Sequence, residues 1–300
     1  MSQALHYRPL PTSVRRHGYR RLWPLARQEM LGLFRTRWGL TLYFFCLFPS
    51  LGRLVMLLIM FGVVDFGPRS MRQRMQDNLP DSMEHLNPER ASFYFETALS
   101  TMPGMVFFLL LTSMVVARSI ARDRATNALE LYWTRGISPW GYVFAKWWGG
   151  FLLTASMTVV MPIVLWLAAG FLAEDWSQLT DTLPQFALGV AGMVMITVLW
   201  TVTGTLLSAI AGSANLAMVL WSVLLVGSFA VGVVIARVLG EPWLRSSLSF
   251  WDAGRVLVRA LAGFDQRGAS PTAAVVTLSS LITVLAVLAR RRMRVVEALQ

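Results

Sequence analysis

FALGVAGMVMITVLWTVTGTLLSAIA, residues 186–211, contains no charged side chain. After a short turn at Gly212 and Ser213, residues 216–239 continue the apolar character as LAMVLWSVLLVGSFAVGVVIARVL. A helix needs roughly 20 mainly apolar residues to cross about 30 Å of hydrocarbon, and each run is long enough. Because only a few residues separate the runs, they predict an antiparallel pair of membrane-spanning helices.

Other apolar runs on both sides of this pair extend the pattern to six predicted spans. Ser138-Pro139 and Ser270-Pro271 each place a capping hydroxyl before a proline, an arrangement typical of helix starts. Thr182, two residues before Pro184, predicts a similar start for the fourth span. The sequence therefore predicts an all-α membrane protein, with spans at Gly39–Val64, Ala98–Ala117, Tyr142–Leu172, Phe186–Ala211, Leu216–Leu239 and Ala273–Ala289.

The composition argues against several other classes of protein. Hydrophobic residues make up 55% of the chain and charged residues only 14%, against about 25% charged in soluble domains. The net charge of +11 lies at the ends of the apolar runs, without a basic helix face, so nucleic-acid binding is not expected. The single cysteine, Cys46, excludes an internal disulfide, and the three histidines have no metal-binding spacing.

The distribution of charge predicts the orientation, because Lys and Arg in short loops are retained in the cytoplasm. With the N-terminus inside, the inner segments hold 17 Lys or Arg and four acids, whereas the outer segments hold nine Arg and 12 acids. We therefore expect a multi-pass protein of the bacterial inner membrane with both termini in the cytoplasm.

The spans divide the chain into segments of different character. Residues 19–37 alternate apolar side chains with arginines and predict an interfacial helix bound to membrane lipids. Residues 241–270 place arginines among aromatic and aliphatic side chains and predict short outer helices that dip into the interface without crossing it. The expected order is a flexible cytoplasmic tail at 1–18, the interfacial helix, the six-helix domain at 38–294 and a cytoplasmic tail at 295–300. Within the six-helix domain we expect an outer loop at 65–92 and a cytoplasmic coupling segment at 118–138.

Two ionisable residues are expected within or near the hydrocarbon. Arg53 lies in the first span after Pro49, and such a charge is costly unless it faces protein or water. Glu96, at the outer start of the second span, is a candidate partner. Arg53 is predicted to line a cavity or to form a purely structural pair; both readings stay open.

The segment after the second span carries a family resemblance. It reads ARSIARDRATNALELYWTRGISPWGYVFAK over residues 117–146. It resembles the membrane subunits of type-2 ABC transporters, in which an acidic-basic run, a Leu-Glu step, a Pro-containing turn and a Lys follow the second span. The chain departs from the pattern at Asp123, where Glu is common, and at Thr126-Asn127-Ala128, where Gly-Thr is common. The matching positions are Arg122, Asp123, Arg124, Thr126, Leu129, Glu130, Pro139 and Lys146.

The resemblance implies a permease subunit of an ATP-binding-cassette exporter. Its coupling helix would dock on a separate cytoplasmic ATPase, and a second copy or a homologous permease would complete the translocation path. No cofactor is expected on this chain, since it lacks the phosphate loop G-x-x-x-x-G-K-[ST]; ATP and Mg²⁺ would bind the partner. The expected contacts of the coupling helix are Arg122, Asp123, Arg124, Thr126, Leu129, Glu130, Trp133 and Arg135.

Alternative functions follow from the same residues. One is a membrane enzyme acting on lipid-linked substrates, with Arg53, Glu96 or Asp252 at phosphate or in acid-base roles, although no paired-carboxylate or nucleophile-base spacing supports it. Another is a membrane scaffold or channel that binds a partner without ATP-driven movement. The outer loop is interpreted as solvated, with a docking site for a periplasmic partner as the alternative.

Overall fold

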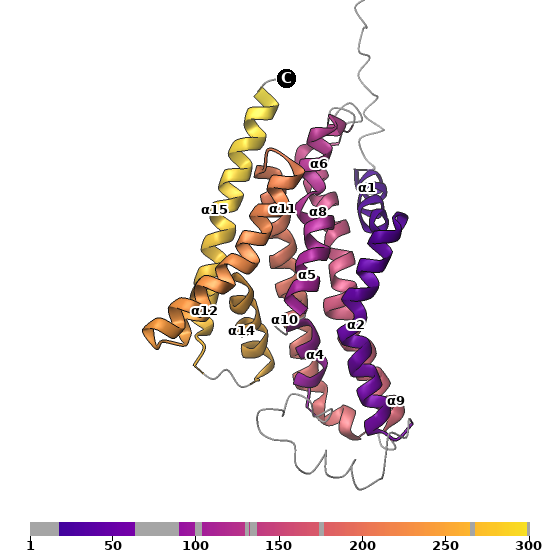
Figure 1. The fold of residues 1–300 in the computed structure, drawn as a ribbon. Helices are drawn as coiled ribbons and strands as arrows, with labels where there is room; N and C mark the ends of the chain where they lie inside the picture. The colour runs from indigo at the N-terminus through magenta and orange to yellow at the C-terminus, as the bar shows by residue number, and fades with distance from the viewer. Residues whose placement is uncertain are drawn as a thin grey trace, which may run out of the picture.

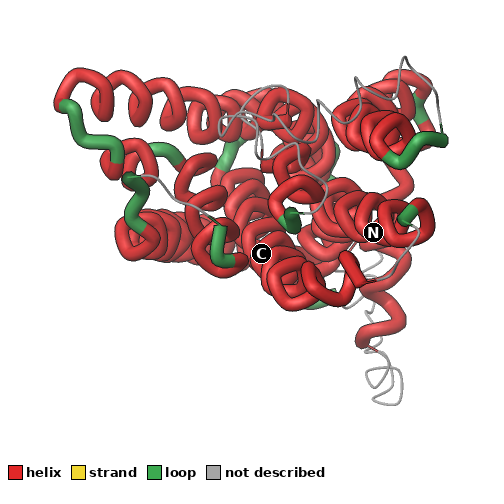
Figure 2. Tube along the Cα trace, turned by 90° about the horizontal axis from the view of Figure 1, so that it is seen from below, coloured by secondary structure: helices red, strands yellow, loops and turns green. Residues whose placement is uncertain are grey.

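The chain forms a bundle of helices in the computed structural model (Figure 1). The structure describes residues 18–63, 90–99, 104–129, 132, 137–173, 177–264 and 268–298. Within these ranges it contains helices and loops and no strand, as the tube drawing also shows (Figure 2). The predicted all-α class is therefore confirmed.

Five helical stretches of the described chain are long and apolar enough to cross a membrane, and a sixth is added if a bent pair counts as one span. The bend lies between Met105–Ala117 and Ser119–Ala125 and measures 41°. The first span is α2 (Arg37–Met60), and the second comprises α5 (Gly104–Thr112), the π-turn η4 (Ser113–Ala117) and α6 (Ser119–Ala125). The third span comprises α8 (Pro139–Ala155), η5 (Ser156–Val160) and α9 (Met161–Leu172), and the fourth is α10 (Ser177–Ile210). The fifth comprises α11 (Ala214–Ser222), η6 (Val223–Gly227) and α12 (Ser228–Leu239), and the sixth is α15 (Pro271–Ala298).

Several helix starts follow from the capping residues. The Ser138 hydroxyl accepts a hydrogen bond from Gly141 N at 3.1 Å, and the Ser270 hydroxyl accepts one from Ala273 N at 3.3 Å. Ser213 caps α11 in the same way, through Leu216 N at 3.2 Å. The start predicted at Thr182 is wrong, because α10 begins at Ser177 and continues through Pro184.

Contacts with α9 explain why α10 passes through Pro184. The Thr182 hydroxyl accepts a hydrogen bond from Trp166 Nε1 at 3.2 Å instead of capping the helix. The Trp166 ring also stacks on Phe186 with 4.6 Å between centroids. These interactions hold the residues around the proline in helical geometry, although the proline removes one backbone hydrogen bond.

A helix near the N-terminus lies where the sequence predicts an amphipathic segment. It is α1 (Gly18–Gly32), followed by a 3₁₀ turn, η2 (Leu33–Arg35), that leads into α2. Figure 1 places α1, α6 and the last turns of α15 at one end of the bundle, here named the α6 end. The opposite end, named the α4 end, carries α4 (Ser92–Leu99) and the last turns of α9.

Two short helices, α13 (Trp243–Leu248) and α14 (Phe250–Ala262), precede the last span. Both are too short to cross a bilayer, as expected. The apolar residues of α14 pack against the bundle: the Trp251 ring stacks on Trp200 of α10 at 4.4 Å, and both rings are fully buried. A Cβ added at Gly254 would lie 2.7 Å from Ile196, so glycine permits this close approach. The placement of α14 in the membrane interface stays a prediction.

The outward faces of the spans are apolar. Large exposed side chains include Phe44 and Phe48 on α2, Val219 and Val223 on the fifth span, and Val276 on α15. A soluble monomer rarely exposes contiguous apolar surface of this extent, whereas lipid accommodates it. The exposed faces therefore agree with a multi-pass membrane protein.

Candidate functional site

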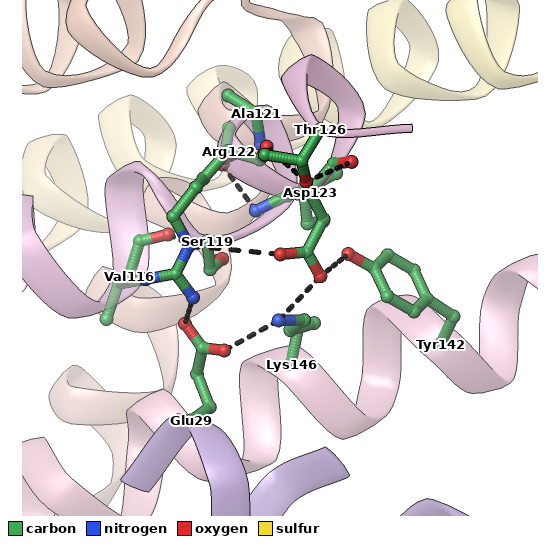
Figure 3. A network of polar contacts seen from close by, with 11 residues as sticks. Glu29, Val116, Ser119, Ala121, Arg122, Asp123, Thr126, Tyr142 and Lys146 are labelled. Atoms are coloured by element: carbon green, nitrogen blue, oxygen red, sulfur yellow. Dashed lines mark hydrogen bonds and ion pairs between the residues drawn. The ribbon is translucent and has the colours of Figure 1, made fainter. Parts of the chain in front are cut away.

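A buried lysine joins three helices at the α6 end. Lys146, the only lysine of the chain, places Nζ 2.6 Å from Glu29 Oε2 and 2.8 Å from Asp123 Oδ2 (Figure 3). The hydroxyl of Tyr142 donates a hydrogen bond to the same Asp123 oxygen at 2.8 Å. Lys146 is only 3% exposed, and its carboxylate partners are also buried. An ammonium at this depth is stable only because both carboxylates meet it directly.

Arg122 completes this group, which we name the lysine network: Glu29, Arg122, Asp123, Tyr142 and Lys146. Arg122 Nη2 lies 3.6 Å from Glu29 Oε1, and its Nε lies 3.8 Å from Asp123 Oδ1. About half of the Arg122 side chain is exposed, so it covers the outer edge of the network. Two cations face two carboxylates, and the network is therefore electrically balanced within itself.

Close helix packing brings the network together. Glu29 comes from α1, Asp123 from α6, and Lys146 with Tyr142 from neighbouring turns of α8. A Cβ added at Gly149 would lie only 2.4 Å from the Ala26 carbonyl oxygen, so α1 rests directly on the backbone of α8. The absent side chain at Gly149 lets Glu29 and Lys146 meet.

Reciprocal capping fixes α6 to α10. The Ser208 hydroxyl accepts hydrogen bonds from Ile120 N at 3.0 Å and Ala121 N at 3.1 Å, which satisfies free N–H groups at the start of α6. In return, Arg124 donates to the carbonyls of Ala209 at 2.7 Å and Ala211 at 2.8 Å, near the end of α10. A cation at a helix C-terminus also interacts favourably with the helix dipole.

The chain turns sharply after α6. Asn127 has φ +54°, the only positive φ of a non-glycine residue in the described part of the chain. Asparagine tolerates this left-handed conformation better than most residues do, which explains how the chain makes the turn without a glycine. Ala125, Thr126 and Asn127 are all exposed, so the turn projects from the α6 end.

The structure divides the predicted coupling residues into groups. Arg122, Asp123 and Arg124 hold α6 in the bundle, Leu129 is buried, and Thr126 lies in the exposed turn, where its hydroxyl donates to the Asp123 carbonyl at 3.2 Å. Glu130, Trp133 and Arg135 lie outside the described residues. The contact of this segment with a partner stays a prediction.

Sequence reasoning did not predict the pairing of Lys146 with Glu29, which are 117 residues apart. Two signals were available. Lys146 is the only lysine among 27 basic residues, and Glu29 is the only acid before the first span. An isolated lysine at the end of an apolar run requires a carboxylate partner, and few candidates existed.

The predicted intramembrane residues lie toward the α4 end. Arg53 Nη1 donates to the Phe93 carbonyl at 3.0 Å, and its guanidinium lies 4.6 Å from the centre of the Phe93 ring. Glu96, one helical turn after Phe93, forms an ion pair with Arg259 of α14. Asp252 pairs with Arg245 at 2.8 Å and Arg255 at 3.1 Å. Both carboxylates, Glu96 and Asp252, are thus paired with arginines, and this arrangement gives no support to an acid-base role for either of them.

The described residues contain no group of three or more His, Cys, Asp or Glu side chains that could hold a metal ion.

Comparison with known families adds a separate observation. Residues 71–289 match the model of a family described as ABC-2 family transporter protein. The matched region contains α6, α8, α10 and the fifth span, and it includes α15 as far as residue 289, whereas α1 and α2 lie before it. No curated protein matches the chain.

Proposed function

Because the chain belongs to the ABC-2 transporter family and is a membrane permease of that family, we propose that it forms the membrane half of an ATP-driven exporter. A separate cytoplasmic ATPase of the ATP-binding-cassette type would supply the energy. ATP and Mg²⁺ would bind that partner, since the only lysine here is flanked by Ala145 and Trp147 and forms no phosphate loop.

The single observation that carries the proposal is the bracing of the exposed turn at residues 125–127. This turn consists of the last residue of α6 and the two residues after it, and α6 is fixed to α1 and α8 by the lysine network and to α10 by reciprocal capping. A surface segment with so many internal attachments is suited to transmit a displacement, because it cannot move without the helices it holds.

This bracing gives Asp123 a different proposed role from that of a partner contact. Its carboxylate is buried and bound by Lys146 and Tyr142, so we assign it to positioning α6. From α6 to Asn127, the described residues that offer exposed surface to an ATPase are Ala125, Thr126, Asn127 and the outer part of Arg122. Arg122 would contribute a charged rim to that interface.

We further propose that two bundles pair and that their α6 ends share one side of the membrane. Two such bundles, either two copies of this chain or one copy with a homologous permease, would enclose the translocation path. The α6 end would face the cytoplasm of a bacterium, with both termini on that side, as the inner excess of arginine favours. Closure of the paired ATPases would press on the two turns and shift α1, α8 and α10 between two arrangements.

Cross-linking with single cysteines tests the proposal. The background is Cys46→Ala, since Cys46 is the only native cysteine and is buried. Thr126→Cys would carry a photoactivatable cross-linker at the exposed turn, and Val238→Cys, 76% exposed at the opposite end of the fifth span, serves as the matched control. The complex is isolated from native membranes, and the cross-linked chain is identified by mass spectrometry.

We expect position 126 to join a chain that carries a phosphate loop, whereas position 238 does not. An intact complex that forms no such product at positions 125, 126 and 127 would contradict docking at this turn. Purification of the permease without any ATPase, under conditions that keep its bundle folded, would contradict the exporter itself.

A further inference from the structure

A second set of charges lies toward the α4 end and differs from the lysine network in its balance. We name it the arginine cluster: Glu96, Arg245, Asp252, Arg255 and Arg259. Asp252 joins Arg245 of α13 to Arg255 of α14, and Arg259, one turn further along α14, pairs with Glu96 of α4. The result is a continuous strip of ionised groups across three short helices.

The strip carries more positive than negative charge. Three guanidiniums face two carboxylates, both of which are mostly buried. Arg255 and Arg259 are separated by four residues on one helix, an arrangement in which like charges repel. Burial lowers the pKa of Arg255 and repulsion from Arg259 adds to this, while Asp252 and Glu96 oppose the shift. The cluster therefore lacks a counter-charge among its own members.

Hydrogen bonding adds to this charge imbalance, although a buried Nε without a partner also occurs at Arg118 and Arg124 and alone does not mark a site. Arg255 Nη1 bonds Asp252, but its Nε is buried and has no hydrogen-bond partner among the described residues. A guanidinium has five N–H donors and no acceptor, so only an acceptor can satisfy the remaining positions. An unsatisfied donor on a buried cation is costly, because the surroundings cannot replace the water it has lost.

The exposure of the two arginines points in one direction. The Arg255 side chain is 15% exposed and that of Arg259 is 31% exposed, so this pair is more open to its surroundings at Arg259; Arg245, at the other end of the strip, is 41% exposed. Side chains four residues apart on a helix are about 5–6 Å apart at Cβ, which lets two guanidiniums contact one tetrahedral anion. Arginine is suited to such contacts, because its N–H groups form a planar fork.

We propose that Arg255 and Arg259 of α14 form a binding site for a phosphate-type oxyanion. The anion would lie between the two guanidiniums, accept a hydrogen bond from Arg255 Nε and supply the missing negative charge. Glu96 and Asp252 would hold the two arginines in place from the other side. The same chemistry is available from a phospholipid headgroup and from a soluble phosphate compound. The site does not depend on an ATPase partner, so it goes beyond the proposed function and can fail separately.

Binding to the full chain in nanodiscs tests the site. In one arm the bilayer is phosphatidylcholine, and inorganic phosphate is titrated against chloride at equal ionic strength. In the other arm phosphate is omitted, and phosphatidylglycerol replaces part of the phosphatidylcholine. The dissociation constant is obtained from the dependence of Tm on ligand concentration. A response to phosphatidylglycerol alone would identify a headgroup, and a response to phosphate would identify a soluble anion.

Three variants locate the response. We expect Arg255→Gln and Arg259→Gln each to weaken binding by at least about tenfold, since each removes a charge-assisted contact. Arg290→Gln, exposed on α15 at the α6 end, is the matched control and should bind as the wild type does. Arg255→Lys keeps the positive charge beside Asp252 but loses the planar arrangement of N–H donors, so this variant should bind the anion severalfold more weakly than the wild type. It also tests the site if Arg255→Gln does not fold.

Two results would overturn the site. One is a wild-type chain whose Tm responds to neither ligand beyond the chloride control, which would mean that the counter-charge comes from the protein itself. The other is a ligand response that persists with unchanged affinity in Arg259→Gln and Arg255→Lys.

Discussion

The lysine network and the arginine cluster both bury charge between short helices and the spans, yet they differ in one respect. In the lysine network, Lys146 and Arg122 face Glu29 and Asp123, and the charges cancel. In the arginine cluster, three guanidiniums share two carboxylates, and the Arg255 Nε has no partner in the described chain. A balanced group can hold helices together without help, whereas an unbalanced one is suited to bind a ligand.

The largest expected effect on stability comes from replacing a cation by methionine, which we compare between the lysine network and the arginine cluster. Lys146→Met leaves Glu29 and Asp123 facing each other without their buried cation, and should lower the free energy of unfolding by about 3–5 kcal/mol. Arg259→Met takes the ion-pair partner from the mostly buried Glu96, but Arg255 and Arg53 remain close enough to interact with this carboxylate and the repulsion between Arg255 and Arg259 is relieved, so the loss should be smaller, at about 1 kcal/mol. Unfolding in detergent, followed by Tm, compares the two. Equal losses would contradict the difference drawn between the two groups.

A smaller effect is expected from Gly149→Ala, which tests whether the lysine network depends on close contact between α1 and α8. The added Cβ would meet the Ala26 carbonyl oxygen at 2.4 Å, so α1 must move, at a cost of about 1–3 kcal/mol. Gly52→Ala in α2 is the matched control, because no atom lies within 4 Å of its Cβ position. A Tm for Gly149→Ala as high as that of the control would show that α1 does not rest on α8.

Ser208→Ala tests the hydrogen bonds between α6 and α10 without altering any charge. Two backbone N–H groups at the start of α6 lose their acceptor, and the free energy of unfolding should fall by about 1–2 kcal/mol. Ser222→Ala is the control, because among the described residues its hydroxyl bonds the Met218 carbonyl of its own helix and no other helix. Hydrogen exchange of the Ile120 and Ala121 amides should rise in the first variant only. Unchanged protection would argue against the capping contact.

The smallest effect is expected at Asn127. Glycine adopts φ +54° without steric cost, so Asn127→Gly should change the free energy of unfolding by no more than about 0.5 kcal/mol, while Asn127→Ala should lower it by about 1 kcal/mol. Thermal unfolding of the two variants measures the difference. Equal stability of the alanine and glycine variants would mean that the turn does not require a left-handed residue.

Local sequence signals were sufficient for most of the spans. The apolar runs and the two Ser-Pro caps predicted where α8 and α15 begin, because each cap acts within one helical turn. Pro184 was misleading, since contacts from Trp166 of another helix keep α10 continuous around it. Interactions between helices decide such cases, and no window along the chain contains them.

The same limit applied to the candidate site. The charged segment after the second span was recognisable, but the Glu29–Lys146 contact joins residues 117 positions apart and leaves no local pattern. For α14, arginines among aromatic and aliphatic side chains predicted a short helix that dips into the interface, but they did not indicate which residues it contacts. The structure places its apolar face against Trp200 and Ile196, and pairs its arginines with Glu96 and Asp252.

The most direct measurement is labelling of single cysteines with a membrane-impermeant maleimide, because docking on a cytoplasmic ATPase requires the turn after α6 to face the cytoplasm. In the Cys46→Ala background, Ala125→Cys should react only after the cells are opened, and Val238→Cys should react in intact cells. Reaction of position 125 in intact cells, with position 238 protected until the cells are opened, would place the turn beyond the reach of any cytoplasmic ATPase and contradict the proposed function.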